Sequence, residues 1–290
     1  MKNFLKFFPK DDINKDNSIN KKNVYLINLI ILLPFLAIFN IKILLASIPF
    51  FLIGYFDDIK NLSIRNRFFI SFIFLFFIFY FDSNFLIKFI IFDKQIVYLN
   101  YFFSFFLSSI LILGFIHVMN MSDGRNSNYG LYMLILFITI FTNTYFLDYK
   151  IDLKILLACF GILIVCILNF RDFSYFGNNG VYALSVFSGI LMFDLYGENY
   201  LSTKNILAIF SIPFIDSLYV SVRRVSKKLS PFKSDLSHLH HLPKKWHLAI
   251  IIQTIAVSLL VYLSYMIGLA YLILLSIILY AFLRFIFKIL

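Results

Sequence analysis

The feature that most constrains this chain is a succession of long, continuous apolar runs that contain few charges. Of the 290 residues, 61% are hydrophobic, 20% are aromatic and 14% are charged, whereas a soluble domain carries about 25% charged residues. No water-soluble core could bury this much Phe, Ile and Leu, so the solvent must be a lipid bilayer. A chain in lipid satisfies its backbone internally, as helices or as a closed barrel. Because the runs do not alternate with polar residues, the sequence predicts an all-α integral membrane protein.

The sequence predicts a polytopic bundle of about ten transmembrane helices. The expected segments are 24–40, 41–56, 68–81, 101–118, 131–147, 153–168, 180–197, 205–222, 248–267 and 269–287. Several are shorter than the roughly 20 residues of a full span, so their boundaries are approximate. Residues 85–92 are too few to span and are expected to be re-entrant or interfacial. A turn is expected at Met266-Ile267-Gly268.

The domain organisation expected from this pattern is simple. Residues 1–23 are polar and mixed in charge, unlike a signal peptide, and are expected to lie in the cytoplasm. Residues 24–290 form a single transmembrane domain. Cys159 and Cys166 lie within one apolar run, which indicates neither a disulfide nor a metal site.

The distribution of basic residues predicts the orientation in the membrane. With the N-terminus inside, 20 of the 26 Lys and Arg residues fall on the cytoplasmic side and six on the other, as the positive-inside rule requires. The net charge of +11 could suggest a nucleic-acid partner. However, apolar segments separate the basic residues and no basic surface stripe forms, so we expect no nucleic acid and a cytoplasmic leaflet of membrane lipid instead.

The first polar motif on the cytoplasmic side is Gly54-Tyr-Phe-Asp57-Asp58, which is followed by Leu62, Arg65 and Arg67. Adjacent carboxylates beside lipid repel each other and are costly. A shared divalent cation or proton would explain them. A solvated helix end is the alternative interpretation.

The second motif is Asn120-Met-Ser-Asp123-Gly124-Arg125-Asn126. A carboxylate beside glycine and amide side chains suits a tight turn that binds a nucleotide or a metal ion. Such clusters also form ordinary turns, and this alternative stays open.

The third motif is Gly177-Asn178-Asn179-Gly180, at the entrance to an apolar helix. A glycine-rich turn at a helix N-terminus can bind phosphate through its backbone N–H groups. A plain loop fits the same residues.

The fourth motif carries the most information. It comprises Pro213-x-x-Asp216, Arg223-Arg224 and Ser230-Pro231-Phe232-x-x-Asp235-x-x-His238-Leu-His240-His241. Three histidines within four residues, after an acid and a basic pair, suit anion binding and proton transfer. Interfacial residues beside anionic lipid would account for the basic residues but not for the histidines.

In these four motifs the chain resembles the polyprenyl-phosphate N-acetylhexosamine-1-phosphate transferases, a family that includes the initiators of O-antigen and teichoic acid synthesis. Residues 213–241 match the family's Pro-x-x-Asp, Arg-Arg and His-x-His-His pattern without a gap. The paired aspartates, Asn-x-x-Asp-Gly and the glycine-rich motif follow the family's order. The resemblance covers nearly the whole chain.

The resemblance implies a reaction, its partners and its location. A polyprenyl (undecaprenyl) phosphate attacks the β-phosphorus of a UDP-N-acetylhexosamine, which releases UMP and starts a lipid-linked cell-surface glycan. The cofactor would be Mg²⁺, with Mn²⁺ as an alternative, because the reaction requires neutralisation of charge around the pyrophosphate. The enzyme would be a multi-pass protein of the inner (plasma) membrane with its active site facing the cytoplasm. A homodimer is compatible with the sequence.

The resemblance also implies site residues. The catalytic set is Asp57, Asp58, His238, His240 and His241. The substrate-binding set is Asn120, Asp123, Asn126, Arg224 and Asp235. The metal ligands are Asp58, Asp123 and Asn178.

Three departures from the family pattern allow a second interpretation. Asn178 stands where the family has an aspartate, which removes a full charge from the metal site. Residues 1–23 replace the family's first membrane helix, and Ser127-Asn128 replaces a Gly-Leu pair. A degenerate relative that binds its ligands without turnover is therefore an alternative. A lipid or sugar transporter is less favoured, because Asp216 alone among the ionisable residues is a candidate for the bilayer interior.

Overall fold

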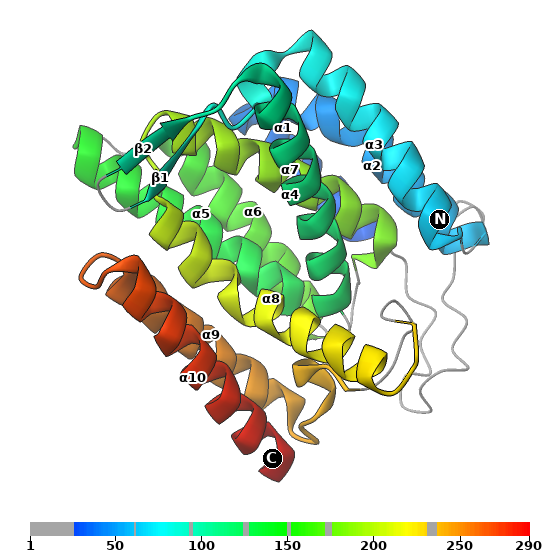
Figure 1. Ribbon diagram of the computed structural model, residues 1–290, viewed down its shortest axis with the longest axis vertical. Coiled ribbons are helices and arrows are strands. Elements are labelled where there is room, and N and C mark those ends of the chain that lie inside the picture. The colour runs from blue at the N-terminus through cyan, green and yellow to red at the C-terminus, as the bar shows by residue number, and fades with distance from the viewer. Residues whose placement is uncertain are drawn as a thin grey trace.

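The computed structural model describes residues 26–60, 62–92, 95–123, 128–149, 152–171, 176–230 and 237–290. Over these ranges the structure confirms the prediction of an all-α polytopic membrane protein (Figure 1). The α-helices are α1 (Leu26–Phe39), α2 (Ile41–Lys60), α3 (Ile64–Phe81), α4 (Tyr101–Ser122), α5 (Asn128–Asp148), α6 (Leu153–Phe170), α7 (Gly177–Gly197), α8 (Thr203–Ser226), α9 (Trp246–Ser264) and α10 (Leu269–Ile289).

Each of the ten expected segments corresponds to one of these helices, and the predicted turn at 266–268 separates α9 from α10. Within the described ranges, eight helices are long and apolar enough to cross a membrane. The other two are α1, which has 14 residues, and α2, which carries Lys42, Asp57, Asp58 and Lys60. Asp57 and Asp58 belong to the first motif, so functional residues contribute to making this helix less apolar.

The segment 85–92, which is expected to be re-entrant or interfacial, leads into and includes the first strand of a β-hairpin. A short 3₁₀ helix, η3 (Ser83–Phe85), leads into β1 (Phe89–Phe92), which pairs antiparallel with β2 (Gln95–Tyr98). The backbone N–H of Ile91 donates to the Tyr196 hydroxyl at 2.6 Å, which attaches the hairpin to α7. These eight residues, which include Lys88, are too few for a membrane helix, and the last four satisfy backbone groups by pairing with the next strand.

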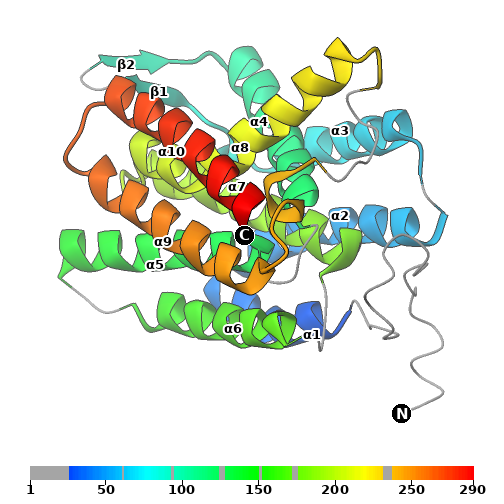
Figure 2. The same ribbon diagram turned by 90° about the horizontal axis from the view of Figure 1, so that it is seen from below.

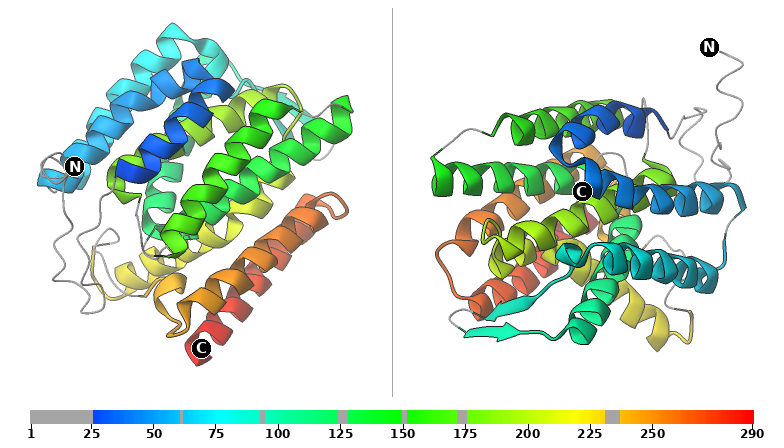
Figure 3. Two further views of the ribbon diagram at one scale, coloured as in Figure 1. Left: turned by 180° about the vertical axis from the view of Figure 1, so that it is seen from behind. Right: turned by 90° about the horizontal axis from the view of Figure 1, so that it is seen from above.

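Helix α7 lies at the centre of the bundle. Every residue from Asn179 to Met192 is buried, because other helices surround this one on all sides. Helices α5 and α6 lie side by side, with α1 next to α6 (Figure 2). Helices α9 and α10 form an antiparallel pair that packs on α8, along one flank of the bundle (Figure 3).

Helices α2 and α7 approach each other closely at Gly54. A Cβ atom built at this glycine would lie 2.4 Å from the backbone oxygen of Asn178 and 2.5 Å from Cα of Asn179. No side chain larger than hydrogen fits there without moving one helix. Gly54 therefore brings the last turn of α2 against the first turn of α7.

Several residues of the polar motifs lie on helix ends, whereas the described histidines of the fourth motif lie in the connection between α8 and α9. Asp57 and Asp58 belong to the last turn of α2, Asn120 to α4, Asn178 to the first turn of α7 and Arg224 to α8. Helices α2, α4 and α8 therefore extend beyond the ends of the apolar segments expected from the sequence. The ends of α2, α4 and α8 and the start of α7 lie at one end of the bundle, hereafter the motif end, and the hairpin lies at the opposite end (Figure 1).

Candidate active site

Asp57 is a buried carboxylate, 3% exposed, that joins three helices at the motif end. Its Oδ2 atom accepts hydrogen bonds from Arg67 Nη1 at 2.8 Å, Asn178 Nδ2 at 3.0 Å and the Tyr182 hydroxyl at 3.4 Å. Arg67 Nη1 also donates to the Tyr182 hydroxyl at 3.1 Å. The ion pair compensates the buried charge and fixes the direction of the Arg67 guanidinium.

Asp58 binds the N-terminus of α7. Its two carboxylate oxygens accept the backbone N–H groups of Asn178 and Asn179, each at 3.2 Å. Helix α7 has no capping side chain of its own at Phe176, so α2 supplies the cap. A carboxylate is favoured there by the unpaired N–H groups and the helix dipole. The turn expected to bind phosphate thus binds a carboxylate of the protein in this structure.

Asn178 bridges the second and first motifs. Its Oδ1 atom accepts a hydrogen bond from Asn120 Nδ2 at 2.6 Å, while its Nδ2 atom donates to Asp57. An amide can make both contacts because it carries a donor and an acceptor, whereas a carboxylate can only accept. The position that departs from the family pattern therefore has a defined role in this chain, as a neutral link between α2, α4 and α7.

Asp123 caps the C-terminus of α4, and its backbone N–H donates to the oxygen of Asn120 at 3.4 Å. Burial, and then the charge of nearby Asp58, raise the pKa of the Asp123 carboxyl well above its usual range. A cation bound near these two carboxylates would favour their charged forms. Asn126 and Asp235, which the sequence also assigned to the site, lie outside the described residues.

The residues present fit a divalent cation in part. Asp58 and Asp123 supply hard oxygen ligands of the kind Mg²⁺ prefers, and a cation would relieve their mutual repulsion. The oxygen of Asn178 already accepts from Asn120. Within the described ranges, no three His, Cys, Asp or Glu side chains group as a metal site, so the ligand set would be two carboxylates completed by substrate oxygens.

The fourth motif lies across from the aspartates. His238 is buried; its Nδ1 atom contacts Asp216 Oδ2 at 2.8 Å, and Arg224 Nη2 donates to its Nε2 atom at 3.3 Å. The rings of His238 and His240 stack with centroids 5.6 Å apart, and the centroid of His241 lies 4.2 Å from that of His240. A short 3₁₀ helix, η4 (Leu239–His241), carries the second and third histidines.

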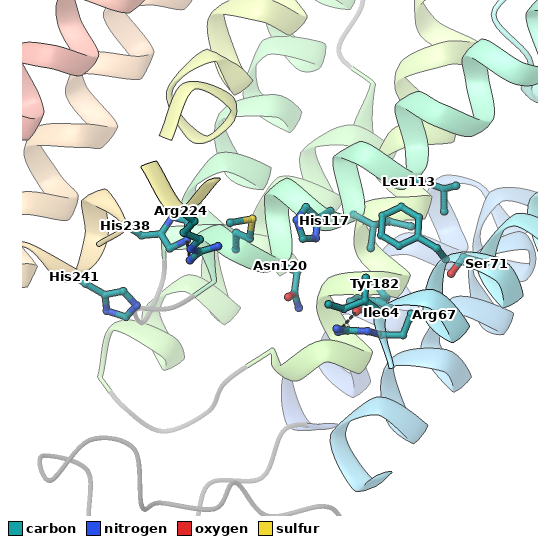
Figure 4. Close-up of a pocket in the computed structure, with 13 residues that line it drawn as sticks. Ile64, Arg67, Ser71, Leu113, His117, Asn120, Tyr182, Arg224, His238 and His241 are labelled. Atoms are coloured by element: carbon teal, nitrogen blue, oxygen red, sulfur yellow. Dashed lines mark hydrogen bonds between the residues drawn. The ribbon is translucent and has the colours of Figure 1, made fainter. Parts of the chain in front are cut away.

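A cavity of about 320 Å³ connects the two sides of the site (Figure 4). Arg67, Tyr182 and Asn120 lie on one side of it, and Arg224, His238 and His241 lie on the other. The rest of its lining is formed by Ile64, Phe68, Ser71, Leu113, Ile116, His117 and Met121. Cationic and amide groups thus line the same cavity as a set of apolar side chains.

Two residues of this site escaped the sequence interpretation. Tyr182 contacts Asp57 and Arg67, and His117 lines the cavity. Tyr182 follows Asn178 by four residues, and His117 precedes Asn120 by three. These spacings place each pair on one face of a helix. Both residues could have been found from the sequence if the motifs had been assigned to helices.

Replacing Asn178 with aspartate tests whether this position binds metal. The new carboxylate would stand beside Asp57, which Asn178 Nδ2 now contacts at 3.0 Å, and the two charges would repel each other. We therefore expect Asn178→Asp to lower the melting temperature of the purified protein in EDTA. We expect Mg²⁺ to restore the stability and to raise the activity.

Asn100→Asp provides the matched control, because Asn100 caps α4 at its other end and an aspartate caps equally well. A melting temperature of Asn178→Asp that does not respond to Mg²⁺ would show that position 178 lies outside the metal site.

Comparison with known proteins gives one family. The family model described as "Glycosyl transferase family 4" matches residues 40–196, which run from the start of α2 to the end of α7 and include the first three motifs. No curated protein matches the chain significantly. The matched segment covers more than half of the chain and contains the Asp57, Asp58 and Asn178 network. The chain therefore belongs to glycosyl transferase family 4, a family of membrane proteins that transfer a sugar phosphate to a polyprenyl phosphate.

Proposed function

We propose that this protein transfers N-acetylhexosamine-1-phosphate from a UDP-sugar to a polyprenyl phosphate such as undecaprenyl phosphate, with release of UMP. The acceptor phosphate attacks the β-phosphorus of the nucleotide sugar, and the bond between that phosphorus and the oxygen bridging to the α-phosphate breaks. The product is a lipid-linked diphosphate sugar that initiates a cell-surface glycan. The reaction takes place at the cytoplasmic face of the plasma membrane, where the positive-inside rule puts the motif end.

The observation that carries this proposal is the mixed cationic and apolar lining of the cavity. Arg67, Arg224 and His241 line the same space as Phe68 and Leu113, so cationic groups suited to phosphates adjoin a surface suited to an isoprenoid chain. A soluble phosphate substrate would need no such apolar wall. An amphiphilic phosphate needs both kinds of lining.

The described residues suggest distinct roles in this reaction. Arg67 and Arg224 would neutralise phosphate oxygens, since a guanidinium offers several donors in a fixed plane. Asp57 would orient Arg67 and the acceptor phosphate, and His241 would contact the phosphates from the opposite side. The ring of His240 stacks on His238 and contacts that of His241 at an angle, and it would hold both in place.

A divalent cation, Mg²⁺ or Mn²⁺, would be held by Asp58 and Asp123 and would supply charge neutralisation at the pyrophosphate. Asn120 would bind the nucleotide sugar and, with Asn178, keep the ends of α4 and α7 at their present separation. Because phosphoryl transfer depends mainly on position and electrostatics, this set of groups is sufficient without a covalent intermediate.

A direct assay tests the proposal. Membranes that contain the chain, given tritiated UDP-N-acetylglucosamine, undecaprenyl phosphate and Mg²⁺, should form a butanol-soluble labelled lipid and an equal amount of UMP. EDTA should abolish the product, and Mg²⁺ or Mn²⁺ should restore it. Membranes without the chain are the control. Absence of a lipid product with each of several UDP-N-acetylhexosamines would refute the transferase proposal.

Asn178 favours a second candidate, a relative that binds nucleotide sugar or lipid phosphate without turnover. Its amide satisfies Asp57 and Asn120 without any cation, so the network is complete in the absence of metal. Binding of UDP-N-acetylglucosamine to the purified protein, together with no product in the assay above, would support this candidate.

A further inference from the structure

Behind the cavity, a buried carboxylate holds the start of the histidine segment. Asp216 of α8 is 6% exposed. Its Oδ2 atom contacts His238 Nδ1 at 2.8 Å, and its Oδ1 atom accepts the backbone N–H of Leu239 at 3.0 Å. The hydroxyl of Tyr280 in α10 donates to the same Oδ1 atom at 3.0 Å. A carboxylate within a membrane helix is costly unless it is paired, and Asp216 is paired by three donors.

A second residue of α10 completes this arrangement. Arg284 Nη1 donates to the Tyr280 hydroxyl at 3.2 Å and lies 3.6 Å from Asp216 Oδ1. Its Nη2 atom donates to the backbone oxygen of Ser237 at 3.1 Å. The guanidinium also lies 4.2 Å from the centroid of the Tyr219 ring. Tyr280 and Arg284 are four residues apart, so one face of α10 holds both Asp216 and the residue that precedes His238.

The contacts of His238 define its tautomer. Arginine side chains are donors only, so the contact from Arg224 Nη2 at 3.3 Å requires a lone pair on His238 Nε2. The ring proton then belongs to Nδ1, where the Asp216 carboxylate accepts it at 2.8 Å. Aspartate commonly fixes a histidine tautomer in this way. Both ring nitrogens of His238 are thus engaged by protein groups.

The consequence concerns Arg224, which lines the cavity and is 3% exposed. A long arginine side chain loses rotamer freedom when its head is held, so a prepositioned guanidinium binds phosphate at lower entropic cost. We propose that Asp216, Tyr280 and Arg284 form a positioning unit that holds His238 as the Nδ1–H tautomer and thereby aims Arg224 into the cavity. His238 is then a positioning residue for Arg224. This inference rests on the proposed function only where it assigns Arg224 to phosphate.

This unit lies outside residues 40–196, the segment that the family model matches. A purely structural role for the same contacts would lower stability but would leave the His238 tautomer independent of Asp216. It would also leave the effects of Asp216 and Arg224 on the reaction independent of each other. Two measurements separate these cases.

The first measurement is the tautomer, which requires no enzymatic activity. Full-length protein labelled with ¹⁵N at its five histidines is reconstituted in nanodiscs, and His238→Gln identifies the His238 signals by their loss. We expect protonated Nδ1 and unprotonated Nε2 in the wild type and in Asp216→Asn, which retains an acceptor oxygen. In Asp216→Ala we expect this signature to be lost. A wild-type ring protonated at Nε2, or an unchanged signature in Asp216→Ala, would overturn the inference.

The second measurement is a double-mutant cycle in the transferase assay. We expect Asp216→Ala and Arg224→Gln each to lower kcat/KM by about 10- to 100-fold, the usual effect of losing a hydrogen bond to a charged group. The kcat/KM of the double variant should equal that of the less active single variant, because both changes remove the same prepositioned group. Multiplicative losses would contradict the proposal.

Tyr280→Phe keeps the cycle informative where Asp216→Ala does not fold, since it removes one hydroxyl donor and retains the ring. We expect a loss of about tenfold in kcat/KM. Tyr271→Phe is the matched control on α10, because Tyr271 is exposed, and its activity should equal that of the wild type. A protein with the expected tautomer but no transferase activity would refute the proposed function and leave the tautomer control by Asp216 standing.

Discussion

Gly54→Ala should lower the transferase activity by about 100-fold, although residue 54 contacts no substrate in the proposed reaction. The added Cβ atom would stand 2.4 Å from the backbone oxygen of Asn178 and 2.5 Å from Cα of Asn179. Backbone atoms at a helix end cannot rotate away as a side chain can. Helix α7 would therefore move away from α2 by about 1 Å, and a displacement of that size in a catalytic group can cost about 100-fold in rate.

This movement of α7 would break the hydrogen bonds that join α2 to the first turn of α7. Asp58 holds the N–H groups of Asn178 and Asn179 at 3.2 Å, and Asp57 holds Asn178 Nδ2 at 3.0 Å. Each of these distances would exceed hydrogen-bonding range after a shift of about 1 Å. Overpacking of this kind also costs about 1–3 kcal/mol of stability, so a lower melting temperature should accompany the loss of activity.

Gly114→Ala is the matched control for Gly54→Ala. Gly114 also lies inside a membrane helix, but a Cβ atom built there meets nothing within 4 Å. Its transferase activity and melting temperature should equal or slightly exceed the wild-type values, since alanine favours helix. Equal activities in the two variants would show that the close approach of α2 and α7 is unimportant for function.

Asp58→Ala should abolish turnover, with an expected loss of about 1,000-fold or more, while the protein remains in the membrane. The change removes the cap of α7 together with one of the two carboxylates that would share the cation. An oxygen ligand of a divalent ion and an electrostatic group at the reacting phosphates each contribute several kcal/mol. The measurement is product formation at saturating substrate and Mg²⁺, with the amount of membrane-inserted protein determined in parallel.

Two variants separate capping from charge at this position. Asp58→Asn retains an oxygen that accepts an N–H of α7 but lacks the negative charge, so it should preserve the melting temperature without restoring activity. Asp152→Ala removes a different carboxylate cap, which accepts the N–H of Lys154 at 2.8 Å. It should cost about 1 kcal/mol of stability and leave turnover intact. Full activity of Asp58→Ala would mean that the catalytic role is wrongly assigned.

The fold was predictable from the sequence where it depends on the length of the apolar segments. Each of the ten expected segments became a helix because lipid allows the backbone few alternatives. The β-hairpin was missed because its strands are short and their apolar residues do not alternate with polar ones. Helix boundaries at the motif end were missed for a different reason. Residues 57 and 120 were taken as loop residues because they are polar, yet buried partners let the helices continue through them.

The site was predictable in its membership but not in its connections. The motifs that contain Asp58, Asn120 and Arg224 are visible as unusual polar clusters in an apolar chain. The bonds of Asp58 to Asn178 and Asn179 join residues about 120 positions apart. No local pattern encodes such a pairing, because it depends on how α2 packs against α7. The same reason explains why Tyr280 and Arg284 could not be assigned to the histidine segment.

The cap that α2 provides for α7 also bears on how the protein is made. Helix α2 is synthesised and inserted into the membrane well before α7, whose first turn has no capping side chain of its own. Until the two helices meet, the contacts between Asp58 and the first N–H groups of α7 cannot form. A nascent chain that ends before α7 therefore contains the paired aspartates but no assembled active site. The contacts between the first and third motifs can therefore form only after the seventh helix has docked.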